Sequence, residues 1–73
     1  MSYAKLRGAI REKIGTQSDF AAKMNMDAAT LSAKLNKKRE WSVSEVMKAC
    51  YILDIPAEQA HLYFFTEKTA FMQ

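Results

Sequence analysis

The sequence predicts an all-α domain of five short helices, and two kinds of observation lead to this prediction. Apolar residues recur every three or four positions along most of the chain, which is the spacing of a buried helical stripe. Helix start signals precede these stretches, notably Thr16 with Asp19 and Ser42 with Glu45. At 73 residues the chain has the length of one domain, so we expect a single unit over residues 1–73.

The first helix is expected over residues 2–14. Ser2 is a candidate N-cap, and Gly15 can supply the left-handed residue that commonly follows a helix end. The apolar stripe of this helix has one member per turn: Tyr3, Leu6, Ile10 and Ile14.

Two short helices joined by a tight turn are expected next, over residues 17–24 and 28–36. Thr16 is the expected N-cap of the first and Asp27 of the second, and Asn25 in the turn tolerates a left-handed backbone. The residues expected to face the core from this helix pair are Phe20, Ala21, Met24, Leu31 and Leu35.

The fourth helix is expected over residues 43–53, opened by a capping box of Ser42 and Glu45. Trp41, just before it, is expected to anchor the preceding basic loop against the core. The apolar stripe assigned to this helix consists of Val43, Val46, Cys50 and Leu53, widened by Met47 and Tyr51.

A fifth helix is expected over residues 56–63, with Pro56 at its first position and Ala60 facing inward. The remaining tail, residues 64–73, has no clear helix signal. Its aromatic residues either close the core or form a contact with a second chain, and closing the core is the preferred interpretation: Phe64, Phe65 and Phe71.

Charge is distributed unevenly along the chain. Residues 1–39 carry nine cations and three anions, a net charge of +6, whereas residues 40–73 carry two cations and five anions, a net charge of −3. A polyanion would be drawn to the half that contains the helix pair, although such charges also occur as ordinary solvated surface.

Several classes of function find no support in the sequence. Cys50, the one cysteine, cannot form an intrachain disulfide, and we expect it to be a small core residue in a reducing cytoplasmic setting. No Cys/His cluster predicts a metal site, no glycine-rich loop predicts a cofactor, and no apolar run approaches the ~18 residues of a membrane span. His61 has no catalytic partner at a suitable spacing, so we expect a protein that is not an enzyme.

The stretch from residue 16 to residue 36, with the basic loop and capped helix that follow, resembles the Cro/CI family of phage repressor helix-turn-helix domains, also called the XRE family. The resemblance covers residues 3–63 and is carried by Gln17, Ala21, Asn25 and Leu31. It implies a lambda-repressor-like DNA-binding domain of five helices, in which the second and third form the helix-turn-helix and the third enters the major groove.

The resemblance also implies two sets of DNA-contacting residues. The base-facing set is Ala28, Ala29, Ser32, Ala33 and Asn36, and the phosphate-contacting set is Thr16, Gln17, Lys34, Lys37, Lys38 and Arg39. Alanine neither donates nor accepts a hydrogen bond, so direct readout falls to Ser32 and Asn36, with Thr30 and Lys34 as further candidates. Otherwise DNA shape and phosphate placement would supply the specificity.

Two functions therefore compete. The main prediction is a sequence-specific, Cro-like transcriptional regulator that binds double-stranded operator DNA as a homodimer, in the cytoplasm of a bacterial host and associated with the nucleoid. The alternative is an antirepressor or repressor modulator that uses the same fold to bind another phage repressor, which the alanine-rich third helix favours. Neither function requires a cofactor or a membrane.

Overall fold

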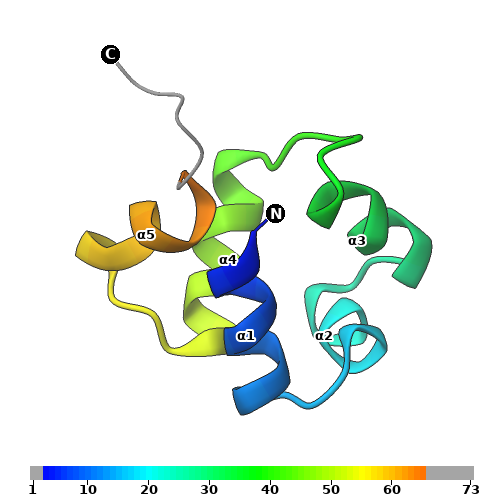
Figure 1. The fold of residues 1–73 in the computed structure, drawn as a ribbon, viewed down its shortest axis with the longest axis horizontal. Coiled ribbons are helices and arrows are strands. Elements are labelled where there is room, and N and C mark those ends of the chain that lie inside the picture. The colour runs from blue at the N-terminus through cyan, green and yellow to red at the C-terminus, as the bar shows by residue number, and fades with distance from the viewer. Residues whose placement is uncertain (1–2, 66–73) are drawn as a thin grey trace.

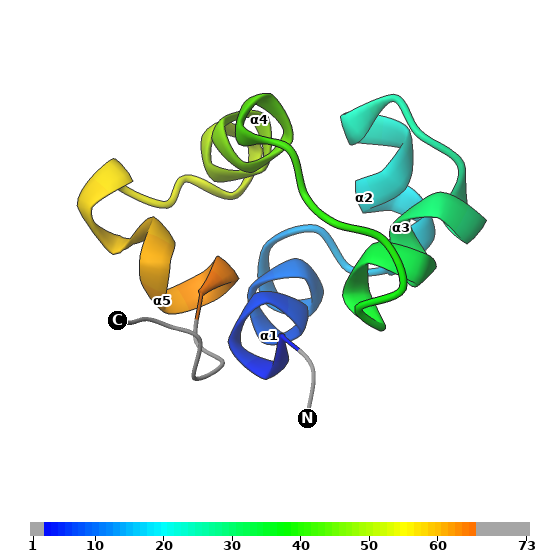
Figure 2. The same cartoon turned by 90° about the horizontal axis from the view of Figure 1, so that it is seen from above.

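The computed structural model describes residues 3–65, which form five α-helices and one short 3₁₀ helix without any strand. The prediction of an all-α, five-helix fold is confirmed. The elements in chain order are α1 (Ala4–Lys13), α2 (Gln17–Met24), α3 (Ala28–Leu35), α4 (Val43–Leu53), η1 (Ala57–Gln59) and α5 (Ala60–Phe64). Helices α1 and α4 lie in the middle, with α2 and α3 on one side and α5 on the other (Figure 1), and Figure 2 shows the same order from above.

Local hydrogen bonds fix the starts of α2 and α4 where the sequence predicts them. The Thr16 hydroxyl accepts a hydrogen bond of 3.0 Å from the backbone N–H of Asp19. Ser42 and Glu45 form the reciprocal capping box, because each side chain accepts from the backbone N–H of the other, at 3.1 and 2.9 Å. These caps satisfy backbone donors that have no partner inside a helix.

The end of α1 and the turn after α2 also follow the prediction. Gly15 has a φ of 121°, and its N–H donates to the carbonyl of Ile10 at 2.9 Å, which closes α1. Asn25 has a φ of 62° and makes the tight turn between α2 and α3. Helix α1 begins two residues later than predicted, and its expected cap, Ser2, lies outside the described residues.

Two other helix boundaries differ from the prediction. Asp27 occupies the N-cap position of α3, but its side chain accepts no cap hydrogen bond, and α3 ends at Leu35. Pro56 does not open the fifth helix. Its backbone is extended, with a ψ of 146°, and it precedes the 3₁₀ turn η1, which then leads into α5.

The buried core takes residues from all five α-helices and from the loop after α4. Its largest fully buried side chains are Leu6, Ile10, Phe20, Leu31, Leu35 and Leu53. Trp41 packs edge-on against Phe64, with ring centroids 5.0 Å apart, so it anchors the loop as predicted. Phe64 is 4% exposed and closes the core, whereas Phe65 is exposed and Phe71 lies outside the described residues.

The buried face of α4 matches the predicted stripe in part, at Cys50, Leu53 and the half-buried Val46. Ala49, Cys50 and Leu53 face the core, whereas Val43, Met47 and Tyr51 are exposed. The physical reason is that apolar residues cover more of the circumference of α4 than the neighbouring elements can contact, so only some of them are buried. Three large apolar side chains therefore lie on the surface.

Candidate functional site

Helices α2 and α3 present the surface that the sequence predicts for DNA. The two helices pack against each other, and Ala21, the small residue of α2, is buried. At the predicted base-facing positions, Ala28, Ala29 and Asn36 are exposed, whereas Ser32 and Ala33 are half-buried. The outer face of α3 is therefore small, and alanine forms much of it.

The polar groups on this face already hydrogen-bond within the chain. The guanidinium of Arg7 donates to the side-chain oxygen of Asn36 at 3.0 Å and to the carbonyl of Leu35 at 3.1 Å. The amide nitrogen of Asn36 donates to the Ser32 hydroxyl at 3.4 Å. The two predicted base readers thus bond to each other, and Arg7 fixes the orientation of the Asn36 amide.

Lys34, which the resemblance places among the phosphate contacts, is buried in the structure. Its side chain is almost fully buried, at 5% exposure, and its ammonium lies 2.9 Å from a carboxylate oxygen of Glu45. The ammonium also donates to the carbonyl of Glu40 at 2.9 Å and lies 5.9 Å from the ring centre of Trp41. The loop after α3 folds back over Lys34, so the lysine ammonium bonds to groups within the fold.

The same ion pair affects Glu45. The pKa of the Glu45 carboxyl is lowered from its ordinary value of 4.5, first by the hydrogen bond from the backbone N–H of Ser42 and then by Lys34. Glu45 therefore stays ionised at neutral pH and fixes the start of α4 to the end of α3.

Other cations of the chain cap the ends of helices. Besides Arg7 at the end of α3, Lys13 donates to the carbonyl of Leu53 at 2.7 Å, and Lys48 donates to the carbonyl of Met24 at 3.4 Å. A cation near a helix C-terminus satisfies free carbonyls and interacts favourably with the helix dipole. Part of the positive charge of the first half thus serves the fold.

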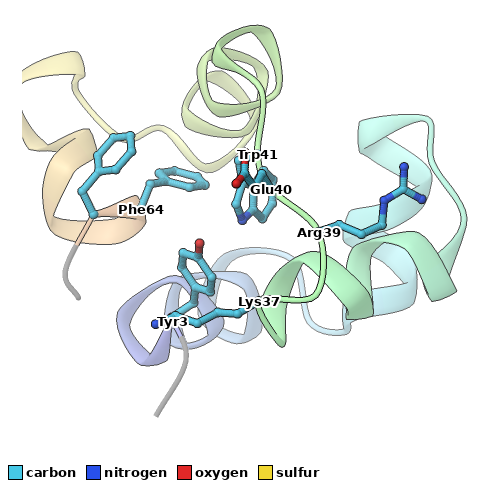
Figure 3. A pocket seen from close by; sticks show the side chains of 7 residues that line it. Tyr3, Lys37, Arg39, Glu40, Trp41 and Phe64 are labelled. Carbon is cyan, nitrogen blue, oxygen red and sulfur yellow. The ribbon is translucent and has the colours of Figure 1, made fainter. Parts of the chain in front are cut away.

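The remaining predicted phosphate contacts are all exposed, namely Thr16, Gln17, Lys37, Lys38 and Arg39. Lys37 adopts a left-handed backbone with a φ of 65°. In Figure 3 the Arg39 side chain extends away from the aromatic residues, toward the side of α2 and α3. Lys37, Lys38 and Arg39 form a basic edge beside α3, immediately after its end, whereas Thr16 and Gln17 lie at the start of α2.

An aromatic hollow of about 380 Å³ lies under the loop after α3. Figure 3 shows Tyr3, Trp41 and Phe64 converging on it, and the Tyr3 ring is 6.3 Å from that of Trp41. The indole N–H of Trp41 is buried and has no hydrogen-bond partner among residues 3–65. The sequence predicts that Trp41 anchors the loop, but it gives no sign of the hollow.

The exposed apolar residues of α4 form a second candidate surface, here named the α4 stripe: Val43, Met47 and Tyr51. They are 76%, 66% and 87% exposed and lie one turn apart. A groove of about 390 Å³ runs beside the stripe, and its lining residues come from α4, η1, α5 and the loop between α4 and η1: Val46, Met47, Cys50, Tyr51, Ile55, Ala57 and Ala60. Exposed apolar groups gathered in this way mark protein-interaction surfaces.

The composition of α4 indicates the α4 stripe, although the sequence-based prediction assigned Val43, Met47 and Tyr51 to the buried face. Eight of the eleven residues of α4 are apolar, which is far more than one buried face needs. The excess indicates that a second surface of the helix is available for a partner.

The described part of the chain offers neither a metal site nor a membrane span. Within residues 3–65, no group of three His, Cys, Asp or Glu residues could hold a metal ion. No helix in this range is long and apolar enough to cross a membrane.

Comparisons with known proteins indicate one family. The family model described as "Protein of unknown function (DUF739)" matches residues 1–67, so the matching family is not the Cro/CI family that the sequence resembles. The chain is similar to the solution structure of the modulator of repression (MOR) of the temperate bacteriophage TP901-1 from Lactococcus lactis. The two are 41% identical over 88% of this chain and 86% of that chain, with a TM-score of 0.79. No curated protein matches the chain.

Proposed function

The chain belongs to the DUF739 family, and we propose that it modulates a phage repressor by binding the repressor protein. Its similarity to a phage modulator of repression supports this role. The structural observation that carries the proposal is the α4 stripe, whose three large apolar side chains are exposed. Burying such side chains against a partner provides the main driving force of protein association.

The outer face of α3 supports the same proposal because it has few groups that could read DNA bases. Three of the five predicted base-facing residues are alanines, and Ser32 and Asn36 bond to each other. Such a face offers few donors and acceptors for reading base edges. The role we propose is one of binding, without enzymatic activity, in the cytoplasm of a bacterial host.

The direct test uses the whole chain, the cognate phage repressor and the repressor's operator DNA. Calorimetric titration of the chain into the repressor is expected to give a saturable complex. A gel shift of the operator by the chain alone is expected to be negative at low salt. A clear operator shift without any complex with the repressor would reject the proposal.

A second candidate function is Cro-like binding of operator DNA as a homodimer. The basic edge beside α3 favours it, because Lys38 and Arg39 are exposed there, and Gln17 is exposed at the start of α2. If these residues contact phosphates, Lys38→Ala with Arg39→Ala should reduce the slope of log affinity against log salt by about one per lost contact. An unchanged slope would remove the basic edge from any DNA interface.

A further inference from the structure

We propose that the groove beside the α4 stripe binds an amphipathic helix of the repressor, one with large aliphatic residues toward α4 and Lys or Arg toward the C-terminal end of α4. The inference rests on the proposed function for the identity of the partner. The shape and charge of the groove indicate what kind of segment fits it.

The shape of the groove suits a helix. Its floor includes Cys50 and Ile55, which are 8% and 6% exposed, and Ala57 and Ala60 on the other wall are too small to block a close approach. Figure 2 shows the elements that form these walls, with α4 on one side and η1 and α5 on the other. An apolar groove of this kind typically receives the apolar face of an amphipathic helix.

The length of the α4 stripe sets the length of the partner segment. Val43 and Tyr51 are two turns apart on α4, which corresponds to about 12 Å along the helix axis. A partner helix of about two to three turns would cover the stripe, with apolar residues at positions such as i, i+4 and i+7.

The charge around the groove is negative at one end. Asp54, at the C-cap of α4, and Glu58, in η1, are exposed and adjoin the lining residues Ile55 and Ala57 in the chain. Lys13 donates to the carbonyl of Leu53 at this helix end, so two carboxylates stand against one cation there. Lys48, the cation of α4, instead points to the α2 side, where it bonds to the carbonyl of Met24. A partner helix with cations at this end is therefore complementary, and one with carboxylates would be repelled.

The test uses two synthetic peptides of about 14 residues that share leucines at i, i+4 and i+7. One peptide carries lysines at its flanking positions and the other carries glutamates. Fluorescence anisotropy measures the binding of each labelled peptide to the full chain. The lysine peptide is expected to bind more tightly, and its advantage should shrink as salt is raised.

Variants locate the binding in the groove. Asp54→Asn with Glu58→Gln should weaken the lysine peptide by about two- to fivefold per carboxylate and leave the glutamate peptide no weaker. Asp27→Asn, at the exposed start of α3, is the matched control and should change nothing. Met47→Ser with Tyr51→Ser should weaken both peptides by about tenfold or more, and both side chains are exposed enough to spare the fold.

Cys50 gives a second readout, because it lines the groove. A saturating amount of lysine peptide should slow alkylation of its thiol by about fivefold or more, since a docked helix covers the groove. The proposal is overturned if the wild-type chain binds neither peptide, if it prefers the glutamate peptide, or if bound peptide leaves Cys50 equally reactive.

The outcomes separate this inference from the proposed function. A chain that binds the repressor but not the lysine peptide would refute the groove and leave the proposed function standing. A chain that binds the lysine peptide but not the repressor would refute the proposed function and leave a helix-binding groove.

Discussion

Replacing Lys34 tests whether this lysine serves the fold or a ligand. Lys34→Ala removes the ion pair with Glu45, the hydrogen bond to the Glu40 carbonyl and the contact with the Trp41 ring. Breaking a fully buried ion pair from one side costs about 3–5 kcal/mol. The Glu45 side chain is 30% exposed, so water can replace part of the lost partner. We therefore expect the free energy of unfolding to fall by about 2–3 kcal/mol.

That loss is large for a chain of this size. A domain of 73 residues has a stability of about 4–10 kcal/mol, so the midpoint of thermal unfolding should fall by about 10–20 °C. Urea unfolding followed by the fluorescence of Trp41, the one tryptophan, measures the change. Lys38→Ala, at an exposed position of the same loop, should stay within about 0.5 kcal/mol of the wild type. A loss below about 0.5 kcal/mol for Lys34→Ala as well would refute the reasoning.

Three further predictions follow from the same structure. Because the folded-state pKa of Glu45 is lowered, its stabilising contribution is present above pH 4.5 and is lost as the pH falls below that value, so Glu45→Gln should flatten the acid side of a stability–pH curve. Gly8→Ala, in an exposed part of α1, should raise the free energy of unfolding by about 0.5–1 kcal/mol. Gly15→Ala should lower it by about 1–2 kcal/mol because Gly15 has a φ of 121°, and urea unfolding midpoints measure both changes. Burial raises the pKa of the Cys50 thiol, so at neutral pH it should react with iodoacetamide more slowly than free cysteine, and equal rates would contradict this burial.

The fold could be predicted largely from the sequence because its main signals are local. Thr16, Asn25 and Ser42 act on the backbone within a few residues of themselves, so their types and spacing fix the helix boundaries directly. The spacing of Leu31 and Leu35 likewise placed both residues inside, and both are fully buried.

The surfaces could not be predicted in the same way, since they depend on contacts between distant parts of the chain. Lys34 is buried because a loop folds back and brings Glu40, Trp41 and Glu45 around it, which no pattern within α3 indicates. The apolar arc of α4 is wide, so the side that faces the core is decided by the packing of α1, α2 and α5 against this helix. The exposure of Tyr51 is a consequence of that packing.

The main predicted function, a DNA-binding regulator, is less well supported than the predicted alternative, a repressor modulator, for a related physical reason. The caps, the turn and the basic charge of α2 and α3 are features of a helix-turn-helix, but they do not determine what its second helix contacts. The similarity to a phage modulator of repression supports the alternative of a repressor modulator better than that of a Cro-like regulator. A protein that binds another protein through α4 can keep the same helix pair as a purely structural unit.

The most direct test of the account is the affinity of the cognate repressor for three forms of the chain. These are the wild type, the stripe variant Met47→Ser with Tyr51→Ser, and a helix-pair variant with Gln17→Ala in α2 and Ala29→Ser in α3. All four positions are exposed. If the α4 stripe binds the repressor, the stripe variant should bind about tenfold or more weakly and the helix-pair variant should bind like the wild type. Full affinity in the stripe variant together with weakened binding in the helix-pair variant would contradict this binding mode.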